Sequence, residues 1–200
     1  MPPTLERDVV TNVLAMLKRS PELIQVITGP RQVGKTTAAR MVASRFKGRV
    51  VEAAADTPLP PGAEWIENQW QRARRLADVG RTNVLLVLDE VQKVRGWSQT
   101  VKALWDDDRR SRRRIKVLVL GSSALLLAKG TTESLAGRFY LHRCGHWSWT
   151  ECRAVFGWDL DHWLYFGGYP GAAALADDEI AWRSYITDSL IETVLARDVL

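Results

Sequence analysis

Cysteine is scarce in this sequence of 200 residues, which contains only Cys144 and Cys152. Two cysteines cannot supply the disulfide framework of a small secreted domain, so we expect both thiols to be reduced. No apolar run approaches the roughly 18 residues that a membrane-spanning helix requires. Residues 1–8 are charged and contain proline, whereas a signal peptide needs an apolar core. These absences predict a cytoplasmic protein without membrane insertion.

Positive charge exceeds negative charge only slightly. Lys and Arg together number 28 against 23 Asp and Glu, which gives a formal net charge of +5. Such a mild excess fits a phosphate-binding cleft as well as a nucleic-acid surface, so charge alone does not choose between them. The length suits one α/β domain with a small appendage and leaves no room for a large second domain.

Residue types that bind zinc occur close together at one place. His142, Cys144 and His146 alternate, so they would share one face of a strand, and Cys152 follows shortly after. Four such ligands could form a zinc site, but their spacing matches no common zinc module. Ordinary packing is favoured because cysteine most often behaves as a small buried hydrophobe.

A phosphate-loop motif, G-x-x-x-x-G-K-T, is the most informative feature that is present. It occupies residues 29–36 and consists of Gly29, Pro30, Arg31, Gln32, Val33, Gly34, Lys35 and Thr36. The apolar run Leu23 to Thr28 precedes it as a buried strand, and helical spacing follows from Lys35 to Phe46. This strand-loop-helix context is the one that the motif requires.

Each position of the motif has a chemical reason. The glycines let successive backbone N–H groups converge on the β-phosphate of a nucleoside triphosphate at a helix N-terminus. Lys35 places a cation between the β- and γ-phosphates, and the Thr36 hydroxyl can coordinate Mg²⁺. Thr37 could contact the α-phosphate. The motif therefore predicts a nucleotide site with Mg²⁺ as its cofactor.

Strand and helix patterns alternate through the first three quarters of the chain, which predicts an α/β fold with a parallel sheet. Further strands are expected at 49–53, 84–88, 116–120 and 138–143, with helices at 63–79 and 97–107. The strand cores are continuously apolar, as strands buried on both faces must be. We predict a nucleotide-binding core at 1–156 and a small helical lid at 157–200, with an amphipathic helix from Ile180 to Leu200.

Polar residues follow two of these strands. Asp89 and Glu90 end the strand 84–88, where Asp89 would hold Mg²⁺ and Glu90 would polarise the attacking water. Ser122 and Ser123 follow the next strand, where a hydroxyl could hold the water or the γ-phosphate, although Gly-Ser-Ser is also ordinary turn chemistry. Arg138 follows Gly137 and suits an arginine finger, with an exposed structural arginine as the alternative.

The densest basic run, residues 109–116, allows two interpretations. It could bind the phosphates of DNA or RNA. A solvated loop, partly offset by the acidic residues 106–108, is favoured because charge runs usually face water. The nine tryptophans are similarly open, since aromatic side chains build cores more often than they stack on bases.

Five motifs taken in order resemble the prokaryotic AAA+ ATPases, whose members carry an uncharacterised C-terminal domain. They are the segments 29–37, 88–97, 121–127, 133–138 and 166–170. The resemblance implies the AAA+ strand order and supports the nucleotide, Mg²⁺, polar-sensor and arginine-finger roles given above. It also implies a homo-oligomer and a further arginine in the lid, for which Arg183 and Arg197 are the candidates.

The chain departs from the family at two places. Family members read Pro-Leu-Ser and then Glu after the fifth strand, whereas residues 145–151 here read Gly-His-Trp-Ser-Trp-Thr-Glu. Members also continue into a winged-helix segment and a further domain, so the lid at 157–200 is expected to be incomplete relative to the family.

The function expected from these features is hydrolysis of ATP to ADP and phosphate by an AAA+ protein that drives a conformational switch. The client would be an unknown protein or nucleic acid. A GTPase would need an Asn-Lys-x-Asp or Thr-Lys-x-Asp segment and a transporter ATPase would need Leu-Ser-Gly-Gly-Gln, and neither occurs. The remaining alternative is a nucleotide-binding regulatory or interaction module with little hydrolysis, which would use the same residues.

Overall fold

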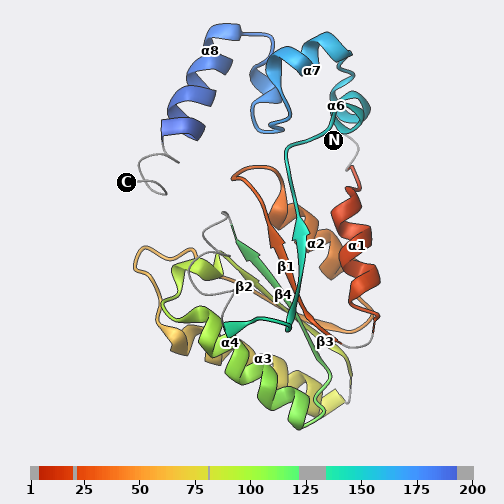
Figure 1. Ribbon diagram of the computed structural model, residues 1–200, viewed down its shortest axis with the longest axis vertical. Coiled ribbons are helices and arrows are strands. Elements are labelled where there is room, and N and C mark those ends of the chain that lie inside the picture. Colours follow the sequence, from red (N-terminus) through yellow and green to blue (C-terminus); the bar gives the residue numbers. More distant parts are fainter. Residues whose placement is uncertain (1–4, 20–21, 81, 122–133, 193–200) are drawn as a thin grey trace. The chain divides into compact units, whose positions relative to one another are not determined.

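The computed structural model describes residues 5–19, 22–80, 82–121 and 134–192. They fall into two compact units (Figure 1). The sheet unit comprises residues 8–29 and 35–143. The lid unit comprises the N-terminal residues up to Arg7, the loop 30–34, and the chain from Cys144 onward. The domain division expected at residue 156 stays a prediction.

Five parallel strands form the sheet in the order β2-β3-β4-β1-β5. Their bounds are β1 Ile24–Thr28, β2 Arg49–Ala54, β3 Val84–Asp89, β4 Ile115–Gly121 and β5 Phe139–Arg143. All five strands were predicted from the sequence within one or two residues of these ends. The parallel α/β class is thereby confirmed.

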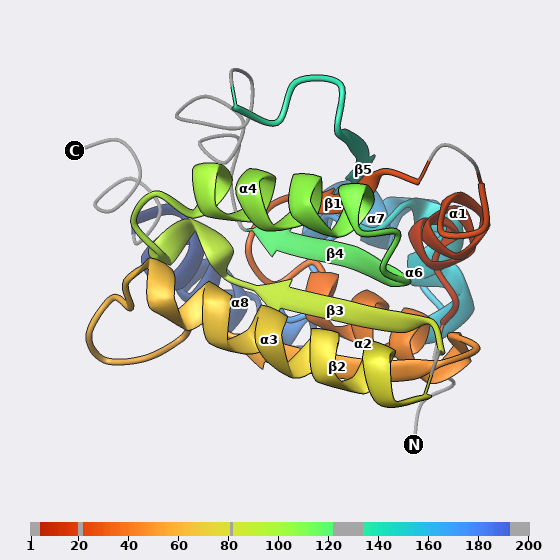
Figure 2. The same ribbon diagram turned by 90° about the horizontal axis from the view of Figure 1, so that it is seen from below.

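Helices cover both faces of the sheet. The sheet unit contains α1 Asp8–Met16, α2 Lys35–Arg45, α3 Ala63–Gly80, the 3-10 turn η1 Val91–Lys93, and α4 Trp97–Arg110. Helices α3 and α4 contact each other and run along β3 and β4, which are seen between them in Figure 2, and α2 lies behind these strands. Because neighbouring residues of a strand point to opposite faces, the central strands β1, β3 and β4 bury side chains on both faces of the sheet.

The alternation is clearest in β3. Val84, Leu86 and Leu88 pack in one apolar cluster with residues of α3 and α4, including Trp70. The intervening Leu85 and Val87 face the other side and are also buried. A strand that is apolar at every position is thus explained by burial on both faces, as the sequence indicated.

Helix α1 was not anticipated from the sequence. Val9, Val10 and Val13 are fully or almost fully buried, and α1 packs against α2 and against the edge strand β5. Its apolar residues lie three and four positions apart, so helical spacing was available as a signal. This helix packs beside β5, the outermost strand on that side of the sheet.

The lid unit is built from short helices with well-formed ends. They are α6 Trp149–Phe156, α7 Leu160–Phe166, the 3-10 turn η3 Ala173–Leu175, α8 Glu179–Ser184, and the π-type turn η4 Tyr185–Glu192. Asp159 and Asp178 cap α7 and α8 through their side chains. The predicted helix from Ile180 begins as expected, and its part beyond residue 192 lies outside the described residues.

A chain of aromatic rings fills the lid unit. Trp147 stacks on Phe156, which contacts Trp158, and Trp158 in turn contacts Phe166. Trp182 meets Phe166 edge to face with ring centroids 5.2 Å apart. These tryptophans therefore serve as packing groups in the lid, as Trp70 does in the sheet unit.

In the described part of the chain, no helix combines the length and the apolar character that crossing a membrane requires.

Candidate active site

Lys35 lies at the point where the phosphate loop enters α2. Its side chain is 7% exposed, and its Nζ donates a hydrogen bond of 2.9 Å to the carbonyl oxygen of Gly29. Gly34, directly before it, has φ +97°, and a Cβ there would meet no heavy atom within 4 Å. Glycine is therefore favoured at this position by its backbone angle and not by a lack of space for a side chain. The outcome is a nearly buried ammonium group held across the loop.

Thr36 and Asp89 meet at the edge of the sheet where the strands end, which we call the carboxyl edge. Asp89 is the last residue of β3, and its Oδ2 accepts a hydrogen bond of 2.7 Å from Thr36 Oγ1. Its other oxygen accepts from the backbone N–H of Glu90 at 2.8 Å. A hydroxyl and a carboxylate in contact are hard oxygen ligands, so this pair fits a Mg²⁺ ion.

Glu90 occupies a left-handed backbone conformation with φ 54° and ψ 31°. Its Oε2 accepts a hydrogen bond of 2.9 Å from Gln92 Nε2 and lies 3.7 Å from Lys93 Nζ. Non-glycine residues at positive φ are uncommon and are concentrated at functional sites. Two residues of the turn η1 thus hold the Glu90 carboxylate, at the cost of backbone strain at Glu90.

The loop residues 30–34 belong to the lid unit, and three other side chains of that unit contact this loop. Val33, which is fully buried, accepts hydrogen bonds at its carbonyl oxygen from Arg7 Nη1 at 3.0 Å and from Trp147 Nε1 at 3.1 Å. Gln32, at φ 59°, contacts the hydroxyl of Tyr185 through its Oε1. Since a trans peptide is planar, fixing the Val33 carbonyl also fixes the direction of the Gly34 N–H.

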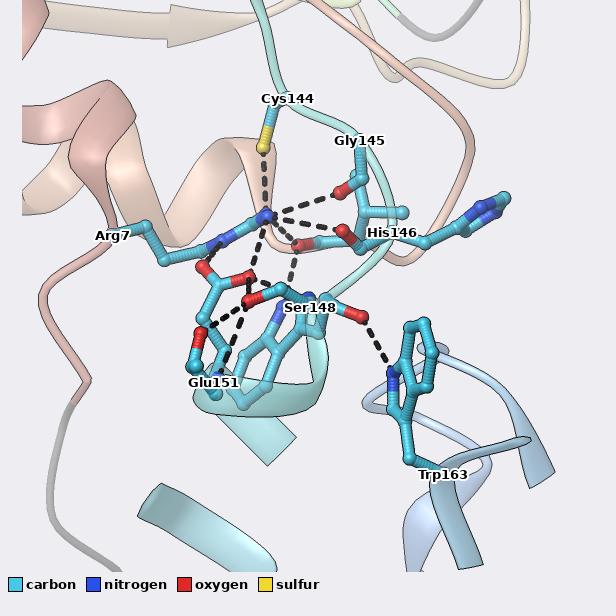
Figure 3. Close-up of polar contacts among 10 residues, drawn as sticks. Arg7, Cys144, Gly145, His146, Ser148, Glu151 and Trp163 are labelled. Carbon is cyan, nitrogen blue, oxygen red and sulfur yellow. Dashed lines mark hydrogen bonds and ion pairs between the residues drawn. The ribbon is translucent and has the colours of Figure 1, made fainter. Parts of the chain in front are cut away.

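Arg7 is the centre of this network (Figure 3). Besides Val33 it donates to the Cys144 sulfur at 3.0 Å and to the Gly145 carbonyl at 3.1 Å. Its Nε forms an ion pair of 2.7 Å with Glu151. One guanidinium therefore joins the N-terminal segment, the phosphate loop, the chain that follows β5, and helix α6.

Glu151 is held from two sides. Burial favours its neutral form, but hydrogen bonds from Arg7 and from the Ser148 backbone outweigh burial and lower the pKa of this carboxyl. Ser148 and Glu151 also form a capping box at the start of α6. The Ser and Glu of the family pattern are thus retained here, although the residues before them differ from it. Trp147, one of these differing residues, donates a hydrogen bond to the Val33 carbonyl of the phosphate loop.

The other predicted site residues have different outcomes. Ser122 and Ser123 lie outside the described residues, as does Arg197. Arg138 precedes β5 at the opposite edge of the sheet and forms an ion pair of 2.9 Å with Asp106. Arg183 forms an ion pair of 2.6 Å with Glu179 on its own helix. Thr37 continues α2 with its side chain exposed.

The residues weighed as zinc ligands have other neighbours. The Nε2 of His142 lies 2.8 Å from Gln25 Oε1, and burial lowers the pKa of this histidine to about 4. Burial, together with the Glu151 charge, raises the pKa of the Cys152 thiol to about 11. Across residues 5–192, apart from the gaps in the described ranges, no three His, Cys, Asp or Glu side chains are grouped to hold a metal.

Sequence reasoning did not identify Arg7, Trp147 or Tyr185 as supports of the loop. The contact between Arg7 and Glu151 spans 144 residues, so no local pattern could reveal it. The capping box, in contrast, has a short signature that was visible in Ser148-Trp149-Thr150-Glu151.

Two relatives match almost the whole length of this chain. Two uncharacterized proteins, Rv2008c of Mycobacterium tuberculosis and Mb2031c of Mycobacterium bovis, are each 31% identical over 199 residues. The match covers 96% of this chain and 39% of each relative. The chain thus spans about two fifths of the length of these relatives.

Solved structures with a similar fold include two archaeal proteins. Cdc6p of Pyrobaculum aerophilum has a TM-score of 0.55 at 15% identity, over 74% of this chain and 48% of that one. The Orc1 protein of Aeropyrum pernix, solved in complex with DNA, has a TM-score of 0.57 at 16% identity. It matches over 89% of this chain and 56% of its own. At such identities the likeness shows the fold alone.

The parallel five-stranded sheet, the phosphate loop after β1 and these similar folds agree with one another. The family model described as an AAA domain matches residues 21–152, which is most of the sheet unit together with the start of the lid unit. The chain belongs to this AAA family, with the AAA+ P-loop fold.

Proposed function

We propose that this chain binds ATP with Mg²⁺ and hydrolyses it to ADP and phosphate. The observation that carries the proposal is the 2.7 Å contact between Thr36 and Asp89, next to the nearly buried Lys35. Two oxygen ligands and a cation at the carboxyl edge of a parallel sheet are what a metal-bound polyphosphate needs. Bound Mg²⁺ would neutralise phosphate charge as the γ-phosphate leaves.

The phosphate loop also fits an anionic ligand. The Nε of Arg31 is buried and has no hydrogen-bond partner among the residues that the structure describes. A buried donor without a partner is costly, and a phosphate oxygen would satisfy it. In this proposal the loop residues 29–37 hold the phosphates, with Lys35 as the principal cation.

Glu90 is the proposed base that orients and polarises the attacking water. Its backbone N–H donates to Asp89, and the strained backbone at Glu90 fixes the point from which its side chain extends. In the described state Gln92 and Lys93 engage the same carboxylate. Hydrolysis therefore requires that Glu90 exchange these partners for water when nucleotide is bound.

The engagement of Glu90 also supports the second candidate function. If Gln92 and Lys93 keep the carboxylate, the chain would be a nucleotide-binding regulatory module with little hydrolysis. Steady-state phosphate release separates the two candidates when the native protein is compared with Lys35→Ala and Glu90→Gln. Hydrolysis predicts that Glu90→Gln binds ATP normally and turns over slowly, whereas equal slow release by all three proteins supports the regulatory module.

Arg138 is proposed to act across an interface in a homo-oligomer, and Ser122 to sense the γ-phosphate. Arg138 lies at the edge of the sheet opposite to Asp89 and is paired with Asp106, so its target would be the nucleotide of another copy. A mixture of Arg138→Ala and Glu90→Gln chains should then recover turnover that neither has alone. The absence of recovery at any mixing ratio would remove Arg138 from the mechanism.

A conformational switch driven by phosphate loss is part of the proposal. The loop 30–34 contacts Arg7, Trp147 and Tyr185 of the lid unit, so a change in the loop reaches these contacts directly. The client that such a switch would act on is a protein or a nucleic acid.

A further inference from the structure

A cavity of about 380 Å³ lies at the opposite edge of the sheet, where β1 and β4 begin, which we call the amino edge. The chain between α1 and β1 lines one side, and the chain between α4 and β4 lines the other. We call it the basic cavity, because six of its eight lining residues are cations. They are Lys18, Arg19, Arg109, Arg112, Arg113 and Arg114, with Glu22 and Asp108 as the two acids.

Both acids of the basic cavity are already neutralised. Asp108 is 3% exposed, pairs with Arg74 at 2.8 Å and with Arg113 at 3.4 Å, and accepts a hydrogen bond from Trp70. Glu22 pairs with Arg109 at 2.9 Å and with Lys116 at 3.0 Å. Each carboxylate is therefore paired with one cation of the cavity and with one cation outside it, and neither is paired with Lys18, Arg19 or Arg112.

Three cations lie outside these pairs. Lys18, Arg19 and Arg112 are exposed, and their side chains form no ion pair or hydrogen bond with any residue in the described ranges. Arg112 has φ 53°, and the turn that holds it is closed by backbone hydrogen bonds from Arg112 to Arg109 and from Arg113 to Asp108. Cations from two separate segments thus converge on one hollow, whereas a merely solvated loop would spread them apart.

An aromatic surface adjoins the basic cavity. Arg19 also lines a second cavity of about 360 Å³ between α1 and β5, together with Tyr140 and Arg143. Tyr140 is 44% exposed, and its ring contacts that of His142 in a tilted arrangement, with centroids 4.9 Å apart. A positive groove with an exposed aromatic ring is the combination that binds single-stranded nucleic acids, since unpaired bases stack on the ring.

We propose that the basic cavity binds the phosphodiester backbone of a single-stranded nucleic acid, with Lys18, Arg19 and Arg112 on the phosphates and Tyr140 stacked on a base. Nothing in this site overlaps the residues assigned to ATP. It names a ligand class for the amino edge of the sheet, where the ATP proposal uses Arg138, which does not line the basic cavity.

The test uses fluorescence anisotropy of a labelled 20-nucleotide oligothymidylate at several salt concentrations. The triple substitution Lys18→Ala, Arg19→Ala, Arg112→Ala is compared with a control of equal charge, Arg40→Ala, Lys47→Ala, Arg75→Ala. The control residues are exposed and lie outside both cavities. The cavity variant should bind at least about tenfold more weakly, and its salt slope should fall by about 2, while the control stays within about twofold.

Tyr140 is tested by a matched pair. Tyr140→Leu should weaken oligothymidylate binding about fivefold or more, and Tyr140→Phe, which keeps the ring, should bind like the native protein. Phosphate release measured without oligonucleotide should be unchanged in every cavity variant, and Lys35→Ala should keep its oligonucleotide binding. These arms keep a failure of this proposal distinct from a failure of the ATP proposal.

Three results would overturn the proposal. The cavity and control variants could lose the same affinity, which would mean only a diffuse charge effect. Polyglutamate of equal charge could compete as well as unlabelled oligothymidylate, which would mean that phosphate is not recognised. A duplex of the same length could bind more tightly than the single strand, which would remove the stacking role of Tyr140.

Discussion

The two edges of the parallel sheet differ in how their charged groups are arranged. At the carboxyl edge, the polar groups contact one another within a few ångströms, as Thr36 with Asp89 and Lys35 with Gly29 do. At the amino edge, five of the six cations of the basic cavity are exposed, and three of them pair with no described residue. The carboxyl edge can therefore select a ligand by the position of single atoms, whereas the amino edge selects by density of charge.

Replacement of Lys35 by Ala should have the largest effect and should act on one edge only. The nearly buried ammonium makes charge-assisted contacts with phosphates, so we expect at least about a hundredfold loss of ATP affinity in calorimetry. Oligothymidylate binding should stay as it is. If both ligands lost affinity together, the two edges would not be independent sites.

Arg7→Ala should have the next largest effect. It should weaken ATP binding at the carboxyl edge, because Arg7 supports the phosphate loop that begins there. Removal of the guanidinium leaves Glu151 and the Val33 carbonyl short of a partner, which we expect to cost about 2 kcal/mol in urea unfolding. ATP affinity should fall as well, because the direction of the Gly34 amide is no longer fixed.

Arg7→Lys is the control for that change. It keeps the charge but lacks the planar fork that reaches Val33, Cys144 and Glu151 together, so part of the loss should remain. Equal stability of Arg7→Ala and the native protein would show that the network of Figure 3 contributes no net free energy.

Mild acid should lower the stability of the whole sheet, and so affect both edges alike, because His142 lies in the sheet between them. Burial lowers its pKa from 6.5 to about 4, so the unfolded chain binds a proton between these values that the folded chain does not. Stability therefore falls as the pH falls from about 6.5 to about 4, by up to about 1.4 kcal/mol per pH unit from this group. Denaturant unfolding across this range should show the slope, and His142→Gln should flatten it.

Glu90→Gly should give the smallest effect on stability, and it should stabilise the protein where the other changes destabilise it. Glycine adopts φ 54° without the strain of a side chain, so the thermal midpoint should rise by an amount equivalent to about 1 kcal/mol. Phosphate release should fall as it does in Glu90→Gln. A less stable Glu90→Gly protein would mean that the contacts with Gln92 and Lys93 outweigh the strain.

The two edges were also predicted from the sequence with unequal success. The pairing of Thr36 with Asp89 followed from two local motifs, since parallel strands bring their carboxyl ends together. The basic cavity did not follow, because Lys18 and Arg112 come from segments more than 90 residues apart and only the run 109–116 was visible. Helix α1 and helix α6 were missed although apolar spacing and a capping box signalled them.

The ion pair between Arg7 and Glu151 has a consequence for the order of folding. Arg7 and the phosphate loop leave the ribosome early, but their partner in α6 is made only after strand β5. Domains that emerge during synthesis fold from the N-terminus, and contacts of long sequence separation form late. A nascent chain of this protein should therefore complete its sheet before its phosphate loop has full support, and acquire firm nucleotide binding only after α6 has been made.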